Sequence, residues 1–162
     1  MVEISINHDD EATKERDKLG GKISEDDLEL LDKSKREQIV KISKEIVAIG
    51  ESLLEQADSA TRDWRKEILE RIDAVNNSIR DMRMPDGLEN KMSTFFINAL
   101  KRSCSNDLDT LSGKLETMII AKKPAKDIEK AQSLITECKA AIKNEVQFAI
   151  DQSKFIINFC QN

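Results

Sequence analysis

The chain has 162 residues, of which 35% are charged and 4% aromatic, with two prolines, no tyrosine and a formal net charge of −5. This composition excludes a strand-rich fold, which needs aromatic and β-branched runs with glycine-rich turns, and it favours an all-α fold. Residues 33–162 balance twenty acidic against twenty-two basic side chains, so we expect no nucleic-acid partner, which would require a strongly basic surface.

Residues 1–22 are predicted to form a disordered acidic arm in front of a single helical domain over residues 23–162. Residues 1–32 carry eleven acidic against four basic side chains. The arm has no apolar run, so it does not resemble a Sec-type signal peptide. Its first residues, MVEISIN, alternate apolar and polar positions. We expect a solvating tail, a segment that orders on a partner, or an export signal read by a secretion machine.

The stretch ISEDDLELL from residue 23 predicts the start of the first helix. Ser24 is a favourable N-cap, and Asp27 occupies the third helical position, as in a capping box. The helix is expected to continue to about residue 57 with a broad apolar face, which favours a globular bundle over a simple dimeric coiled coil. Gly50 lies inside this helix, where it either costs up to about 1 kcal/mol or permits close approach of a neighbouring helix.

Further helices are predicted on both sides of a turn at Met84-Pro85-Asp86-Gly87. The stretch ADSATRDW (57–64) indicates a break or a phase shift, with Asp58 or Ser59 as a cap. Another helix should run from Leu88 through Leu100. A break follows it, with Ser105, Asn106 or Asp107 as the next cap, and a short helix then leads to AKKPAKD (121–127), where Pro124 ends one helix or starts another.

The most apolar predicted helix covers residues 125–160, and we expect it at the centre of the bundle because its apolar positions surround more than one side. One of its rows contains Ile128, Ile135, Ile142, Ala149 and Ile156. Together the segments predict an elongated, mostly antiparallel helical bundle of about four to six helices, with coiled-coil-like segments and loops near 84–87 and 121–126.

The sequence gives no sign of catalytic or cofactor chemistry. The single histidine, His8, lies in the predicted arm, where it could not be held beside a serine or cysteine nucleophile. No Glu-x-x-His pair, glycine-rich phosphate loop or zinc-ligand spacing is present. The three widely spaced cysteines, Cys104, Cys138 and Cys160, favour reduced thiols in a cytoplasmic compartment. We therefore expect no enzymatic activity, no cofactor and no metal.

The first candidate partner-binding stretch is FFINALKR (95–102). Phe95 and Phe96 are adjacent, so their side chains point about 100° apart on a helix. Either both pack inside the bundle, or one of them is an exposed anchor for a partner helix, with Lys101 and Arg102 at its rim.

The second candidate is the C-terminal FIINFCQN (155–162). Either Phe155, Ile157 and Phe159 belong to the end of the core helix, or they form an oligomer contact. We expect no transmembrane segment in the chain and no binding to a membrane surface; in this stretch the two nearby lysines are balanced by Glu145 and Asp151.

The AKKPAK stretch (121–126) contains Lys122, Lys123 and Lys126. Cations are favourable at a helix C-terminus, and this is the simpler interpretation of the three lysines. The alternative is a short nuclear-localisation run, a pattern with many false positives.

These observations predict a non-catalytic protein-binding module: an adaptor, a regulator or an accessory subunit that binds a protein partner through a helix face or groove, with the acidic arm modulating binding. One alternative is a self-assembling structural protein that forms a homodimer. The other is a helical effector that is exported or translocated by means of its N-terminal residues.

Overall fold

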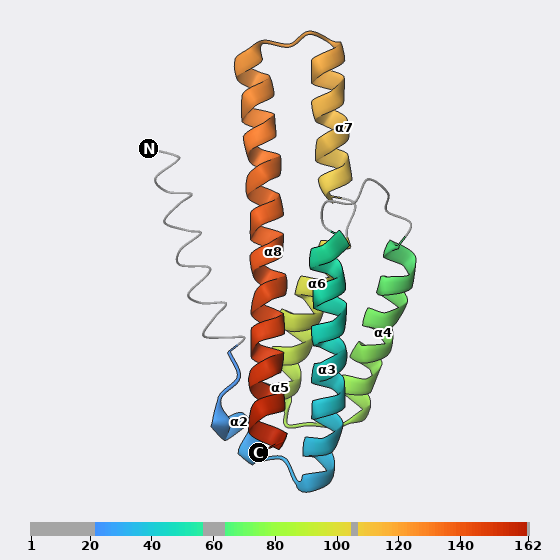
Figure 1. The fold of residues 1–162 in the computed structure, drawn as a ribbon, viewed down its shortest axis with the longest axis vertical. Helices are drawn as coiled ribbons and strands as arrows, with labels where there is room; N and C mark the ends of the chain where they lie inside the picture. Colours follow the sequence, from blue (N-terminus) through green and yellow to red (C-terminus); the bar gives the residue numbers. More distant parts are fainter. Residues whose placement is uncertain (1–21, 57–63, 105–106, 162) are drawn as a thin grey trace.

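The computed structural model describes residues 22–56, 64–104 and 107–161, and this part of the chain forms an elongated, mostly antiparallel helical bundle (Figure 1). The predicted all-α fold is confirmed. Residues 1–21 of the predicted arm (1–22) lie outside the described residues, as do the candidate caps Asp58, Ser59, Ser105 and Asn106. The helices are α2 (Glu25–Glu29), α3 (Lys33–Gln56), α4 (Arg65–Asp81), α5 (Asp86–Asn90), η1 (Lys91–Ile97), α6 (Asn98–Ser103), α7 (Asp107–Ile120) and α8 (Ala125–Gln161).

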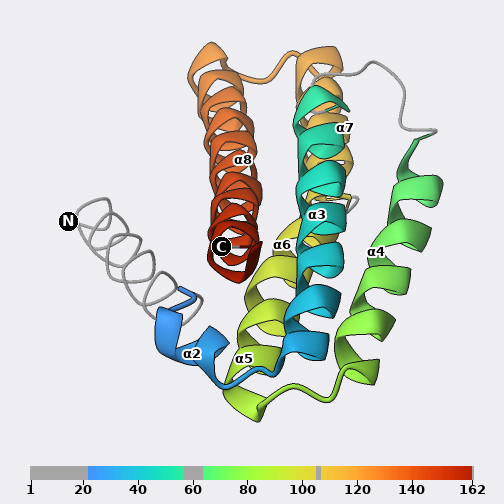
Figure 2. The ribbon, with the colours of Figure 1, turned by 60° about the horizontal axis from the view of Figure 1, so that its bottom comes forward.

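The first helix begins as predicted but ends early. Ser24 caps α2, and Ser24 and Asp27 form the reciprocal capping box. The expected continuous helix to about residue 57 is wrong, because the chain turns after Glu29 and α3 starts at Lys33. Asp32 provides the reason, since its Oδ1 accepts a hydrogen bond from the backbone N–H of Lys35 at 2.9 Å and starts a new helix. The turn places α2 beside the lower end of α8 (Figure 2).

The core forms where α3, α4, the continuous rod of α5, η1 and α6, and the C-terminal half of α8 pack together. The broad apolar face predicted for α3 supplies much of it. Its fully buried side chains include Ile39, Ile46, Ile49 and Leu53. The most extensive helix contact joins α3 to α8, which run in opposite directions (Figure 1).

The predicted turn at Pro85 is confirmed. Helix α4 ends at Asp81, Arg83 has a φ of 53°, and the Pro85 carbonyl accepts hydrogen bonds from the backbone N–H groups of Leu88 and Glu89 at the start of α5. The π-helical segment η1 that follows is an addition to the predicted helix, since no residue pattern in the sequence announces it.

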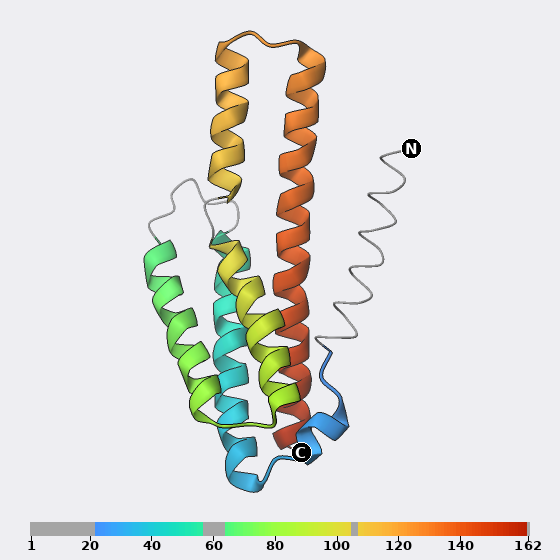
Figure 3. The same cartoon turned by 180° about the vertical axis from the view of Figure 1, so that it is seen from behind.

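Only half of α8 occupies the predicted central position. Ile150 and Ile156 are fully buried, whereas Ile128 and Ile142 are half-buried and Leu134 is exposed. The helix has 37 residues, which corresponds to a length of about 55 Å. Its N-terminal half extends beyond the ends of α3 and α4, and α7 lies beside it (Figures 1 and 3). The prediction that the entire helix is central was therefore wrong, because several helices surround its C-terminal half whereas α7 lies beside its N-terminal half (Figure 1).

Candidate functional site

The principal candidate site is the two-helix projection formed by α7 and residues 125–142 of α8, here called the hairpin. Helix α7 packs on α8 (Figure 3). Its inner side chains follow the spacing of three and four residues that is typical of paired helices. They are Leu108, Leu111, Leu115 and Met118 on α7, and Ile128, Ala131, Ile135, Cys138 and Ile142 on α8. Of these only Ile135 is buried, and the others are half-buried.

The apolar face of α8 in the hairpin is wider than α7 can cover. Its positions 131, 134, 135, 138, 141 and 142 are Ala, Leu, Ile, Cys, Ala and Ile. A face of this width is typical of a helix with more than one neighbour. Leu134 remains 48% exposed and Ala141 is exposed as well. Among the described residues, three of the four exposed large apolar side chains lie on the hairpin, namely Ile119, Ile120 and Leu134.

The turn between α7 and α8 is closed by backbone hydrogen bonds. The N–H of Lys123 donates to the carbonyl of Met118 at 3.0 Å, and the N–H of Lys122 donates to that of Ile119 at 3.1 Å. This pair of bonds is the Schellman motif, with Lys122 in the left-handed conformation at a φ of 55°. Pro124 then directly precedes α8, which is one of the two alternatives that the sequence left open.

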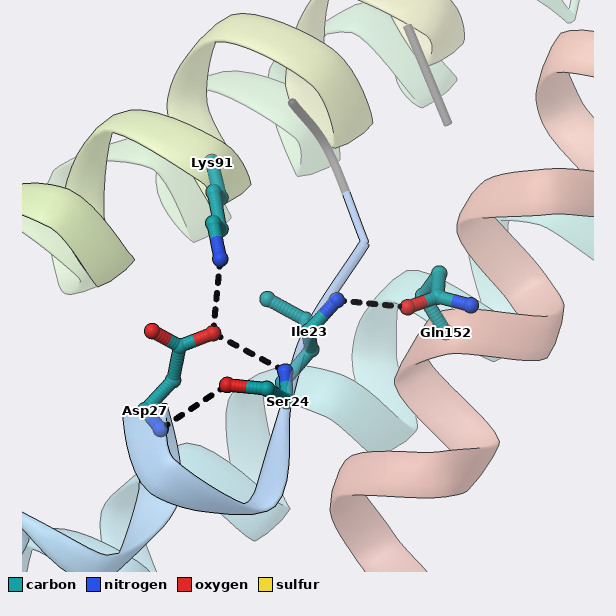
Figure 4. Close-up of polar contacts among 5 residues, drawn as sticks. All are labelled: Ile23, Ser24, Asp27, Lys91 and Gln152. Carbon is teal, nitrogen blue, oxygen red and sulfur yellow. Dashed lines mark hydrogen bonds and ion pairs between the residues drawn. The ribbon is translucent and has the colours of Figure 1, made fainter. Parts of the chain in front are cut away.

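A second feature fixes α2 to the bundle (Figure 4). Lys91 on η1 donates to Asp27 Oδ2 at 2.7 Å, and the backbone N–H of Ile23 donates to Gln152 Oε1 on α8 at 2.7 Å. Burial alone would raise the pKa of Asp27, but hydrogen bonds from Lys91 and Ser24 outweigh it and hold that pKa below its usual value. Ile23 and α2 are therefore anchored beside the C-terminal half of α8.

The structure separates the four residues of the first predicted stretch. Phe96 is fully buried and packs edge-on against Phe148, with ring centroids 6.4 Å apart, so partner binding through Phe96 does not fit its position. Phe95 is half-buried against the core. The Nζ atom of Lys101 lies 3.7 Å from Oδ1 of Asp73, and Nη1 of Arg102 lies 2.7 Å from Oε1 of Glu145. Both cations thus connect neighbouring helices, and a partner contact by Phe95, Lys101 or Arg102 stays a prediction.

The second predicted stretch lies at the end of α8, where its aromatic residues border the core. Phe155 and Phe159 stack with ring centroids 6.4 Å apart, and the Arg36 guanidinium lies 5.6 Å from the Phe159 ring centroid. Ile157 is half-buried. Burial raises the pKa of the neighbouring Cys160 thiol, although the charge of Arg36 opposes part of this effect. Phe155 and Phe159 thus contact each other and Arg36 within the chain, and an oligomer contact through this stretch stays a prediction.

An open cavity of about 660 Å³ between α4 and η1 was not foreseen from the sequence. Asn76 lines it and is nearly buried, and its Oδ1 accepts a hydrogen bond from Ser93 at 3.4 Å. The lining carries charges of both signs, from Arg80 and Lys101 as well as from Asp86 and Glu89. Charges of both signs spread along a groove indicate no single class of ligand.

Within the described ranges, no group of three or more His, Cys, Asp or Glu side chains could hold a metal ion. None of the helices in these ranges is long and apolar enough to cross a membrane. Comparison with protein-family models, with curated proteins and with solved structures found no match for the chain. Its function is therefore inferred from its own surfaces.

Proposed function

We propose that this protein is a non-catalytic protein-binding module, and that it holds an amphipathic helix of a partner protein along the hairpin. The observation that carries the proposal is the uncovered apolar face of α8 around Leu134 and Ala141, beside inner side chains that α7 leaves half-buried. An amphipathic helix laid in such a groove is a common mode of protein recognition.

The energetics favour a third helix at this position. Fully burying a leucine contributes roughly 1.5–3 kcal/mol, so covering the exposed half of Leu134 would contribute on the order of 1 kcal/mol. Further burial would come from the half-exposed inner side chains. The rest of the bundle is the rigid support, because α8 runs without interruption from the core into the hairpin. The acidic N-terminal residues would modulate binding through electrostatic steering.

The test is capture of partners from native lysate with the full chain, Leu134→Arg and Leu30→Arg. Leu30 is the matched control because it is 71% exposed and lies outside the hairpin, next to α2. A charge at position 134 should weaken capture of a specific partner at least tenfold, whereas the Leu30 variant should capture it normally. Equal capture by both variants would place the binding surface elsewhere.

The same experiment separates partner binding from self-assembly if the solution mass of each bait is recorded. A full chain that runs as a dimer, together with a monomeric Leu134→Arg variant, would show that a second copy covers the face. In that case the self-assembling structural protein becomes the better account.

A further inference from the structure

The end of the hairpin combines exposed apolar side chains with an excess of positive charge. Ile119 is 50% exposed and Ile120 is 81% exposed. The turn that follows contributes Lys122 and Lys123, and Lys126 lies in the first turn of α8. All three lysines are exposed, and Asp127 is the one acidic side chain in residues 117–127. These five side chains are here called the tip.

The stability of the turn accounts for only part of this charge. The dipole of α7 favours cations beyond its C-terminus, which explains positions 122 and 123. The dipole of α8 disfavours a cation in its first turn, where Lys126 lies. Lys122 has a φ of 55°, a conformation in which glycine is the most favourable residue. Stability of the turn therefore does not explain the charge at position 126, and at position 122 it favours a cation but disfavours a residue with a side chain.

We propose that the tip docks on the surface of a membrane that contains anionic phospholipids. The isoleucine side chains would enter the boundary between headgroups and acyl chains, and the lysine ammonium groups would contact lipid phosphates while their stems lie along the apolar layer. A flat, deformable, negatively charged surface suits this tip because the tip is the end of a projecting rod and not a groove (Figures 1 and 3).

The distribution of charge along the rod favours attachment by this end. Helix α2 and the turn after it lie at the opposite end of the bundle (Figure 1). Residues 25–32 there include five acidic side chains, which Lys33, Lys35 and Arg36 follow directly, and Lys91 pairs with Asp27. Charges of both signs at that end give an anionic surface no comparable attraction, so attachment by the tip would leave the long axis standing away from the membrane. This surface differs from the face around Leu134, so the two proposals can fail independently.

The test measures co-sedimentation of the full chain with phosphatidylcholine vesicles, with and without about 30% phosphatidylserine. We expect binding to the anionic vesicles to exceed binding to the neutral ones by at least tenfold. Each lysine near such a surface contributes about a fivefold gain in affinity, so Lys122→Gln, Lys123→Gln and Lys126→Gln together should weaken binding on the order of 100-fold. Ile120→Ser should weaken it several-fold, and about 1 M salt should remove the electrostatic part.

Matched controls lie elsewhere on the chain. Leu30→Ser alters an equally exposed apolar side chain, and Lys41→Gln, Lys44→Gln and Lys154→Gln together remove the same charge from exposed positions outside the tip. Both controls should bind anionic vesicles as the unaltered chain does. Failure of the full chain to bind these vesicles at low salt would overturn the proposal. So would equal losses in tip and control variants, or tip variants that lose a protein partner while vesicle binding stays unchanged.

Discussion

Gly50 on α3 faces Ile150 on α8 so closely that a Cβ atom added at position 50 would lie 2.6 Å from Cγ1 of Ile150. Real Cβ atoms essentially never come that near another heavy atom. The missing side chain therefore permits the close α3–α8 contact. Of the two explanations offered by the sequence, close approach is the one that the structure supports.

Gly50→Ala should destabilise the protein even though alanine is the better helix former. Overpacking a closely packed core typically costs about 1–3 kcal/mol, and the gain in helix propensity of about 1 kcal/mol offsets only part of it. Denaturant titration would measure the change. Gly113→Ala on α7 is the control: nothing lies within 4 Å of the added atom, so the free energy of unfolding should rise by about 0.4–1 kcal/mol. Equal effects would contradict the close approach.

Two buried serine hydroxyl groups, Oγ of Ser43 and Oγ of Ser153, have no hydrogen-bond partner within the described residues. An unsatisfied buried polar group costs about 1–3 kcal/mol, so Ser43→Ala and Ser153→Ala should each raise the free energy of unfolding by about 1 kcal/mol. Urea unfolding of each variant would measure this rise in the free energy of unfolding. Ser78→Ala removes an exposed hydroxyl bonded to the Ala74 carbonyl, and it should change stability by less than about 0.5 kcal/mol. Loss of stability in both core variants would indicate bound partners for these hydroxyls.

The contact between Asp27 and Lys91 should make the free energy of unfolding depend on pH in the acid range. The folded-state pKa of Asp27 is lowered, so its contribution is present above the unfolded pKa of about 4 and is lost as the pH falls through the folded value. Asp27→Asn should be less stable at neutral pH, and the difference from the unaltered chain should shrink below about pH 4. Urea unfolding of both chains between neutral and acid pH measures it. A difference that stays constant with pH would exclude this ion pair as its source.

Cys160 should react slowly with alkylating reagents near neutral pH. Burial raises the pKa of its thiol, and the thiolate is the reactive form. Labelling with iodoacetamide, followed by peptide mass spectrometry, should show a pH midpoint above that of free glutathione. The buried Cys104 should be labelled only on unfolding. Labelling of Cys160 at the glutathione rate would mean that the end of α8 is open to solvent.

Local signals in the sequence predicted the features that depend on neighbouring residues. Ser24 and Asp27 form a capping box within four residues, and Pro85 cannot continue a helix. The end of α2 was missed because Asp32 is one acidic residue among many, and only its hydrogen bond to Lys35 distinguishes it. The π-helical geometry of η1 equally lacks a residue signature.

Placement in space could not be predicted from periodicity alone. Ile128, Leu134 and Ile150 all belong to apolar rows of α8. Ile128 is nevertheless half-buried, Leu134 is exposed and Ile150 is fully buried. The exposure of each side chain depends on which neighbouring helices extend as far as its position on α8. The candidate site was equally hard to predict. The sequence drew attention to Phe96, which is buried in the core, whereas the exposure of Leu134 depends on the neighbours of α8. Helices α3 and α4 end below the N-terminal half of α8 (Figure 1).

Because α8 is shared by the bundle and the hairpin, the two parts should differ in how readily they open. No described side chain of α7 is buried, so α7 can separate from α8 while the core stays folded, and its amide hydrogens should exchange with solvent faster than those around Ile150. The hairpin would then be a local unfolding unit attached to a stable one. Slowed exchange confined to α7 and residues 125–142 would report that something has covered the hairpin, whatever its chemistry.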